Sequence, residues 1–294
     1  MKKKYKMIPE GSVYRVEALR NFGNVKKGDV GGLIESEHNL SHDGMCWVYD
    51  EAMIYGNAQV YGDAKIYDNA EVHGKAAIFG NAQVFDNAVV YGNAKVHDDA
   101  KVYGDSVIYG NAQIWNDVQV FDKARVWDNT WISDKAKVYG NAQVFDNVRV
   151  DEKAVIYGNA RITNRAKVYG MAKIYGDAVV YDNAIVCEKA KVYGDARIYD
   201  SAQVYGDAIV FGDSRVYGAA EIGDSAKICS KADYIVFKNW WSSGRYFTWT
   251  RSNDKWKVGC FFGSGEELIE KAYSDSEEKG KEYERIVRYV ESIC

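Results

Sequence analysis

The stretch VYDEAM IYGNAQ VYGDAK IYDNAE, from Val48 to Glu71, decides the fold of this chain. An aliphatic residue recurs in it every six positions. From Val48 to Ile228 there are 31 such positions, and every one is Val or Ile. The position four residues later is Ala in 26 of the 31 cases, and no residue is inserted or deleted over the span. An internal repeat therefore organises most of the chain.

A period of six residues excludes an amphipathic α-helix, whose apolar face recurs every 3.6 residues. A β-branched residue and a small residue instead alternate along short extended segments, as a half-buried strand requires. Between them stands G-N, G-D or D-N, and these residues tolerate positive φ and bend the chain. Each hexad thus predicts a short strand followed by a corner, with Val or Ile inside.

This pattern resembles the hexapeptide-repeat left-handed β-helix, whose motif is aliphatic-x-x-x-small-x. The resemblance implies a left-handed parallel β-helix with three hexads per coil, which makes about ten coils from 31 hexads. At a strand spacing of roughly 4.8 Å, ten coils extend roughly 50 Å. The Y-G-[ND]-A wording is similar to that of a group of bacterial and phage proteins described as hexapeptide-repeat or acyltransferase-like.

The repeat divides the chain into three parts, and the predicted fold class is mainly β with a small α+β domain at the end. Residues 1–47 break the period and are predicted to be an N-terminal cap, because a solenoid end exposes unpaired strand edges. Within this cap, Val25–Glu35 is predicted to form a strand, a turn and a strand. Residues 48–233 form the β-helix, and residues 234–294 form the α+β domain.

The α+β domain is predicted to contain three strands and two helices. The strands are Tyr234–Lys238, Arg245–Arg251 and Lys255–Phe262, separated by turn-forming residues. Capping boxes then predict the starts of the helices, at Ser264 with Glu267 and at Ser274 with Glu277.

Composition restricts the function classes. A formal net charge of −4 over 294 residues argues against nucleic-acid binding, which usually depends on a strong basic field. No apolar run reaches the ~18–20 residues of a membrane span, and the N-terminus has no secretory signal. The five cysteines are scattered without a C-x-x-C pair, so neither a disulfide framework nor a metal site is indicated. We expect a cytoplasmic protein without a cofactor.

Aromatic residues follow the buried aliphatic ones. The next residue is Tyr, Phe or Trp at 23 of 31 positions, and rings 18 residues apart should stack. Such ladders either add cross-strand packing or mark an association surface. Because many left-handed β-helices are trimers, the resemblance implies a homo-oligomer, with a trimer favoured.

Two departures from the repeat give a candidate surface patch. One is a charged stretch of one predicted face, and the other is a group of tryptophans. The residues are Lys135, Lys153, Lys189, Trp115, Trp127 and Trp131. They indicate either a solvated, locally repacked wall or a docking site for a protein partner.

The C-terminal segment concentrates a second candidate set, which mixes arginine, lysine and tryptophan. The residues are Trp240, Trp241, Arg245, Trp249, Arg251, Trp256 and Lys257. They are either the core of a small domain or a site for a small anionic ligand, since cations beside aromatic rings suit planar anions such as nucleotides.

The hexapeptide class is best known for acyltransferases that use coenzyme A, with a general-base histidine and a loop protruding from one coil. Of four histidines here, His97 is the candidate base, but the repeat carries no inserted loop. The sequence therefore favours a non-enzymatic binding or scaffolding protein. The alternatives are a phage-encoded trap or inhibitor that binds a nucleotide-like ligand or a host defence protein, and a coenzyme A-dependent acyltransferase.

Overall fold

The computed structural model describes residues 3–293, and the chain divides into two compact units, Met1–Met171 and Ala172–Cys294. Both units contain coils of a parallel β-solenoid, and the second also holds the C-terminal α+β module. The fold is mainly β, with about eleven coils in total and a small antiparallel sheet with two helices at the end. The predicted fold class is confirmed, with about one coil more than the repeat alone predicts.

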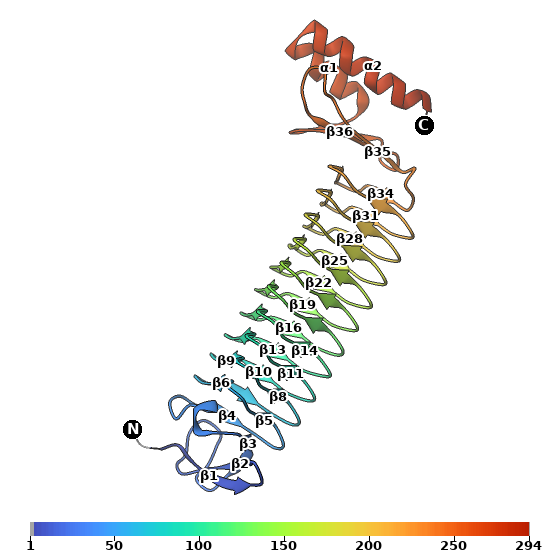
Figure 1. Cartoon of the computed structure of the whole chain (residues 1–294). Helices are drawn as coiled ribbons and strands as arrows, with labels where there is room; N and C mark the ends of the chain where they lie inside the picture. The colour runs from blue at the N-terminus through green and yellow to red at the C-terminus, as the bar shows by residue number, and fades with distance from the viewer. Residues whose placement is uncertain (1–2, 294) are drawn as a thin grey trace. The chain divides into compact units, whose positions relative to one another are not determined.

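The coils are built of two-residue strands, each of which ends on the repeated Val or Ile. They begin with β4 (Trp47–Val48) and recur every six residues, through β5 (Met53–Ile54) and β8 (Glu71–Val72), to β24 (Lys167–Val168) in the first unit. In the second unit they run from β25 (Lys173–Ile174) to β34 (Lys227–Ile228). Figure 1 shows successive strands stacked along each coil face.

Within each unit, the coil strands pair in parallel with the strands 18 residues later, so three hexads make one coil. Strand β5 aligns with β8 so that Met53 lies beside Glu71 and Ile54 beside Val72. The Val and Ile side chains are 0–1% exposed, and the small residues at the Ala positions up to Ala226 are equally buried. Burying each aliphatic side chain contributes about 1.5–3 kcal/mol, so the solenoid interior dominates the stability of both units.

The corners depend on residues that accept positive φ. Gly80 has φ 67° and Asp98, one coil later, has φ 57°. At most corners where aspartate replaces glycine, its carboxylate accepts an N–H from the next coil, as Asp86 Oδ2 does from Gly104 N at 3.0 Å. This hydrogen bond offsets the cost of about 1–2 kcal/mol that a side chain has in the left-handed region.

The outward rings stack as predicted. Phe85 and Tyr103 have centroids 4.7 Å apart and planes 2° apart, and Tyr103 stacks on Phe121 at 4.9 Å. Parallel rows of amides run beside the rings, where Asn93 Nδ2 donates to Asn111 Oδ1 at 3.1 Å. The rings are mostly half-buried, so they form part of the structure of the wall.

The N-terminal segment forms a hairpin and contributes to the first coil. Strands β1 (Tyr5–Glu10) and β2 (Val13–Ala18) pair in antiparallel fashion, and β3 (Val30–Ile34) lies between β2 and β5 in the same sheet. The short helix η1 spans Glu37–Asn39. Of the strand–turn–strand predicted at Val25–Glu35, the structure contains β3.

Ile34 and Leu40, six residues apart, are fully buried and align with Ile54 and Val60. The coil therefore begins before Val48. This explains the additional coil. It is not apparent in the sequence, because two extra residues between Leu40 and Val48 break the six-residue period.

Side chains of this cap satisfy carbonyl groups of the first coil. The Asn39 amide donates to the carbonyls of Gly56 at 3.0 Å and Ala58 at 2.9 Å. Arg15 Nη1 donates to Asp50 O at 3.2 Å. Lys4, with no exposed surface, donates from Nζ to Cys46 O at 2.9 Å. The cap thus supplies mainly hydrogen-bond donors; Glu35, whose carboxylate accepts the N–H of Gly56, is the exception.

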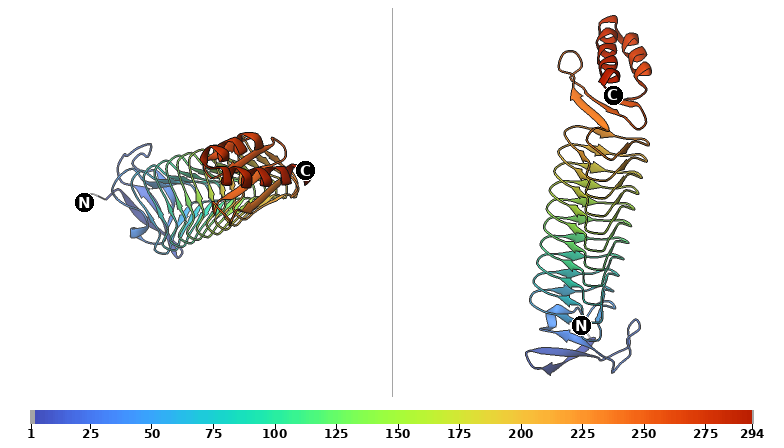
Figure 2. Two further views of the ribbon diagram at one scale, coloured as in Figure 1. Left: turned by 90° about the horizontal axis from the view of Figure 1, so that it is seen from above. Right: turned by 90° about the vertical axis from the view of Figure 1, so that its right-hand side faces the viewer.

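The C-terminal module contains four strands, because Gly259, at φ 57°, ends the predicted third strand early. The strands are β35 (Tyr234–Lys238), β36 (Tyr246–Thr250), β37 (Lys255–Val258) and β38 (Phe261–Gly263), in that order in an antiparallel sheet. Helices α1 (Gly265–Asp275) and α2 (Glu277–Ile293) follow and lie together against the sheet (Figure 2).

The start of α1 is confirmed, because Ser264 and Glu267 form the predicted capping box. The predicted start of α2 at Ser274 is wrong. Ser274 lies inside α1 and donates its hydroxyl to Lys271 O, while Ser276 Oγ accepts the N–H of Lys279 at 3.2 Å.

The module also covers the last coil of its unit. Thr248 Oγ1 accepts the N–H of Glu221 at 3.1 Å, and Ser252 Oγ accepts the N–H of Lys227 at 2.6 Å. Asp233 Oδ2 accepts the N–H of Cys229 at 2.7 Å. This cap supplies mainly hydrogen-bond acceptors; Tyr234, which donates to Arg215 O at 3.1 Å, is the exception.

Candidate functional site

Two adjoining clefts open on the C-terminal module, between its sheet and its helices. The first, here called the apolar cleft, has a volume of about 510 Å³. Its walls are the end of β37, the turn into β38, one face of α1 and two residues of α2. The lining residues are Arg245, Val258, Cys260, Phe261, Phe262, Leu268, Lys271, Ala272, Asp275, Lys279 and Tyr283.

The second, here called the polar cleft, has a volume of about 430 Å³. Trp241, Ser242, Ser243 and Arg245 form one side, and Ser276, Glu278 and Lys279 form the other. The second side is the start of α2, a helix of 17 residues whose first N–H groups carry partial positive charge. Arg245 and Lys279 line both clefts, so the two clefts meet at these cations.

The clefts hold three cations and two carboxylates. Asp275 pairs with Lys279 and lies 3.8 Å from Lys271 Nζ. The hydrogen bond from Lys279 holds the pKa of the Asp275 carboxyl below its ordinary value, so this group is ionised at neutral pH. Arg245 makes no ion pair in the described part of the chain, and its side chain lies against Gly259. Its guanidinium group is therefore the cation available to an incoming anion.

Exposed tryptophans flank the polar cleft. Trp240 is 74% exposed and Trp241 is 84% exposed. Lys238 Nζ lies 4.0 Å from the centroid of the Trp240 ring, whereas Trp241 lines the polar cleft. These two neighbouring rings form an exposed apolar patch at the rim of the polar cleft.

The remaining predicted residues of this segment lie elsewhere. Trp249 and Trp256 are 6% and 1% exposed and pack in the core between sheet and helices. Arg251 is exposed in the turn after β36, and Lys257 lies 3.6 Å from Glu221 of the last coil. The structure thus brings Arg245 and Trp241 to a cleft, places Trp240 on the same loop, and separates the other four from it.

Sequence reasoning missed Lys271, Lys279 and Tyr283. Their spacing of four residues, from Lys279 to Tyr283 and from Lys271 to Asp275, places pairs on one helix face. That pattern was a usable signal, but it does not show which face turns toward Arg245.

The predicted patch on the solenoid is only partly assembled. Trp115 and Trp131 meet edge to face at 6.3 Å, and Arg149 lies 5.3 Å from the Trp131 ring. Trp127 stands in a different ring column, stacked on Phe145 at 4.3 Å.

Lys135 and Lys153 are exposed at equivalent corners of adjacent coils. Lys189 is an exposed corner residue of the second unit. The described contacts therefore contain a small Trp–Arg cluster and a separate row of corner lysines.

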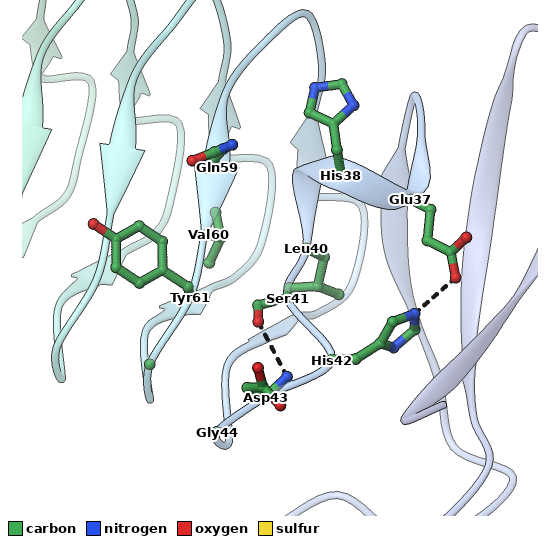
Figure 3. A pocket seen from close by; sticks show the side chains of 11 residues that line it. Glu37, His38, Leu40, Ser41, His42, Asp43, Gly44, Gln59, Val60 and Tyr61 are labelled. Carbon is green, nitrogen blue, oxygen red and sulfur yellow. Dashed lines mark hydrogen bonds and ion pairs between the residues drawn. The ribbon is translucent and has the colours of Figure 1, made fainter. Parts of the chain in front are cut away.

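A third cleft of about 570 Å³ lies beside the first coil (Figure 3) and contains His38 and His42. His42 Nε2 lies 2.8 Å from Glu37 Oε1, and Nδ1 accepts the N–H of Lys4 at 3.2 Å. Both nitrogens of this ring are occupied by structural contacts, so His42 has no free lone pair for proton abstraction.

His97, the candidate base, is a rung of a ring ladder. It stacks on Phe79 at 4.6 Å, and its Nδ1 lies 3.1 Å from Asp98 Oδ2. It lines none of the three clefts described above.

Within residues 3–293, no three His, Cys, Asp or Glu side chains gather closely enough to hold a metal ion. Neither α1 nor α2, nor any other described helix, combines the length and apolarity that a membrane crossing needs.

The family model described as the YdcK beta solenoid repeat matches residues 82–98, 172–188 and 202–218. The three segments fall within the hexad repeat. No curated protein matches the chain. The repeat match and the coiled structure together show a repeat β-helix protein.

Proposed function

We propose that this β-solenoid protein is a non-enzymatic binding protein whose C-terminal module captures a small anionic ligand. The observation that carries the proposal is Arg245, a guanidinium without an ion pair among the described residues, at the junction of two clefts.

The surroundings of Arg245 favour an anion. Lys279 lies on the opposite side of the same junction, and the start of α2 adds the partial charge of its N–H groups. Glu278 opposes this field, but the cations still outnumber the carboxylates. Charge-assisted hydrogen bonds from a guanidinium to an oxyanion are among the stronger polar contacts in proteins.

The test is calorimetric titration of the full chain with pyrophosphate at low ionic strength. Replacing Arg245 by Ala should weaken binding at least tenfold, because a hydrogen bond to a charged group contributes about 1.5–3 kcal/mol. Arg251 offers a matched control, since it is an exposed arginine at the other end of β36 and lines neither cleft.

Arg251→Ala should bind pyrophosphate as the original protein does. Absence of binding at millimolar pyrophosphate would contradict the proposal. Equal losses in the two variants would show a diffuse charge effect without a site.

A further inference from the structure

One residue that lines the apolar cleft, Tyr283, has a buried hydroxyl that the fold does not use. Tyr283 is 2% exposed, lines the cleft, and packs edge to face on Phe247 with centroids 4.8 Å apart. Its Oη atom is buried and has no hydrogen-bond partner within residues 3–293. An unsatisfied buried hydroxyl costs about 1–3 kcal/mol, so folded proteins retain few of them. A polar ligand group that reached this hydroxyl from the cleft would satisfy it.

The walls around Tyr283 define what such a ligand looks like. Val258, Phe261 and Leu268 are apolar and lie on β37, β38 and α1. A volume of about 510 Å³ falls within the ~300–1,000 Å³ of small-molecule sites. Charged side chains also line this cleft, namely Arg245, Lys271, Asp275 and Lys279. Walls of both kinds suit a ring that is largely apolar on its faces and polar at its edge.

The polar cleft requires a different group on the same molecule. Arg245 and Lys279 line both clefts, so a ligand that reaches Tyr283 places its other end beside these cations and the first turn of α2. An inorganic anion would leave the apolar walls and the Tyr283 hydroxyl unused. An uncharged ring compound would leave the cations unused.

We propose that the two clefts form one site for a mononucleotide, with the phosphate at Arg245 and Lys279 and the base in the apolar cleft. The nucleobase forms a hydrogen bond with Tyr283 Oη. This hydroxyl serves as donor or acceptor and so suits the edges of purines and pyrimidines alike. This assignment rests on the proposed function, in which the cleft captures an anion, and it adds the class of ligand.

Tyr283→Phe tests the assignment, because it removes the hydroxyl and keeps the ring. The full-length variant should melt at the same temperature as the original protein or higher, since an unpaired buried polar atom is lost. Its affinity for AMP should fall roughly fivefold, the equivalent of one neutral hydrogen bond. Its affinity for ribose 5-phosphate, which has no base, should not change. The original protein should bind AMP more tightly than ribose 5-phosphate.

Three results would overturn the inference: equal affinities for AMP and ribose 5-phosphate, unchanged AMP binding in Tyr283→Phe, or a lower melting temperature in that variant. Trp241→Ala distinguishes two positions of the base, inside the apolar cleft or stacked on Trp241 at the rim of the polar cleft. If this variant loses the preference for AMP while Tyr283→Phe keeps it, the base lies on Trp241 instead. Pyrophosphate binding that depends on Arg245 would survive each of these failures, so the proposed function would stand without the nucleotide assignment.

Discussion

The two caps of the solenoid form hydrogen bonds with different backbone groups and therefore use different side chains. In the first unit, the amide of Asn39, the guanidinium of Arg15 and the ammonium of Lys4 donate hydrogen bonds to carbonyls of the early coil. In the second unit, the hydroxyls of Thr248 and Ser252 accept hydrogen bonds from N–H groups of the last coil. Thus mostly donors cover one end of the repeat, and mostly acceptors cover the other.

The reason lies in the direction of the bonds between coils. Outside the strand ladders they run from an N–H of one coil to a carbonyl of the next, as from Gln59 to Ala76 and from Asp63 to Gly80. Without the caps, the first coil would therefore have carbonyls without donors, and the last coil would have N–H groups without acceptors. A buried backbone group left unpaired is costly, so the two ends select different side chains.

The largest expected effect comes from removing a donor that serves two carbonyls. Asn39→Ala should lower the free energy of unfolding by about 3 kcal/mol, because the half-buried carbonyl of Gly56 and the buried carbonyl of Ala58 lose their partner at about 1–3 kcal/mol each. Urea denaturation measures the loss, and hydrogen exchange should show it first at Gly56 to Ala58.

Asn93→Ala is the matched control for this change. Its side chain is exposed and bonds to the amide of Asn111 at 3.1 Å, so the change should be within about 0.5 kcal/mol. Equal losses at Asn39 and Asn93 would mean that the first coil does not depend on donors from the cap.

A smaller effect is expected at the other end, where one acceptor serves one N–H. Thr248→Val keeps the shape of the side chain and removes Oγ1, which leaves the Glu221 N–H unpaired. The free energy of unfolding of the module should fall by about 1.5 kcal/mol, which is within the cost of an unsatisfied donor. Denaturation followed by the fluorescence of buried Trp249 and Trp256 reports on it.

Thr248→Ser restores the oxygen and should recover most of the stability. If serine and valine destabilise the module equally, the methyl group and its packing matter at this position, and the comparison of donor and acceptor caps fails at its C-terminal end.

The repeat itself was predictable because each hexad contains the residues that determine its strand and its corner. Val or Ile recurs without interruption from Val48 to Ile228, and Ala stands four residues later in 26 of the 31 hexads. The register between coils follows from the period. Ile34 and Leu40 were not recognised as part of the coil, since the two-residue insertion before Val48 removes the periodic signal. The left hand of the helix still rests on the resemblance.

The candidate site was only partly predictable, because its residues come from segments that only folding brings together. Arg245 and Trp241 drew attention by composition, but Trp249 and Trp256 carry the same composition and belong to the core. Alternation along an extended strand places Arg245 and Trp249, four residues apart, on one face. It did not show that the helices cover that face at Trp249 and leave a cleft at Arg245. The roles of Lys279 and Tyr283 depend on how α2 packs.

The smallest net change in stability is expected for a substitution of Lys4, and the sign of its pH dependence is informative. This ammonium group is fully buried, donates to Cys46 O, and lies 3.2 Å from Cys46 Sγ. Burial lowers its pKa, against the opposing influence of Cys46. Lys4→Met removes a donor to the first coil but also a desolvated charge, so we expect a change in stability below about 1 kcal/mol at neutral pH.

The pH dependence separates these two contributions. Between the lowered pKa of Lys4 and 10.5, its ordinary value, the unfolded chain binds more protons than the folded one, so stability from this group rises with pH. The original protein should therefore gain stability relative to Lys4→Met as the pH approaches 10.5. Cys46 titrates nearby, and its raised pKa has the opposite sign, so both proteins should carry Cys46→Ala. A stability difference that stays constant or falls with pH would show that the N-terminal cap holds Lys4 as a charge the fold favours.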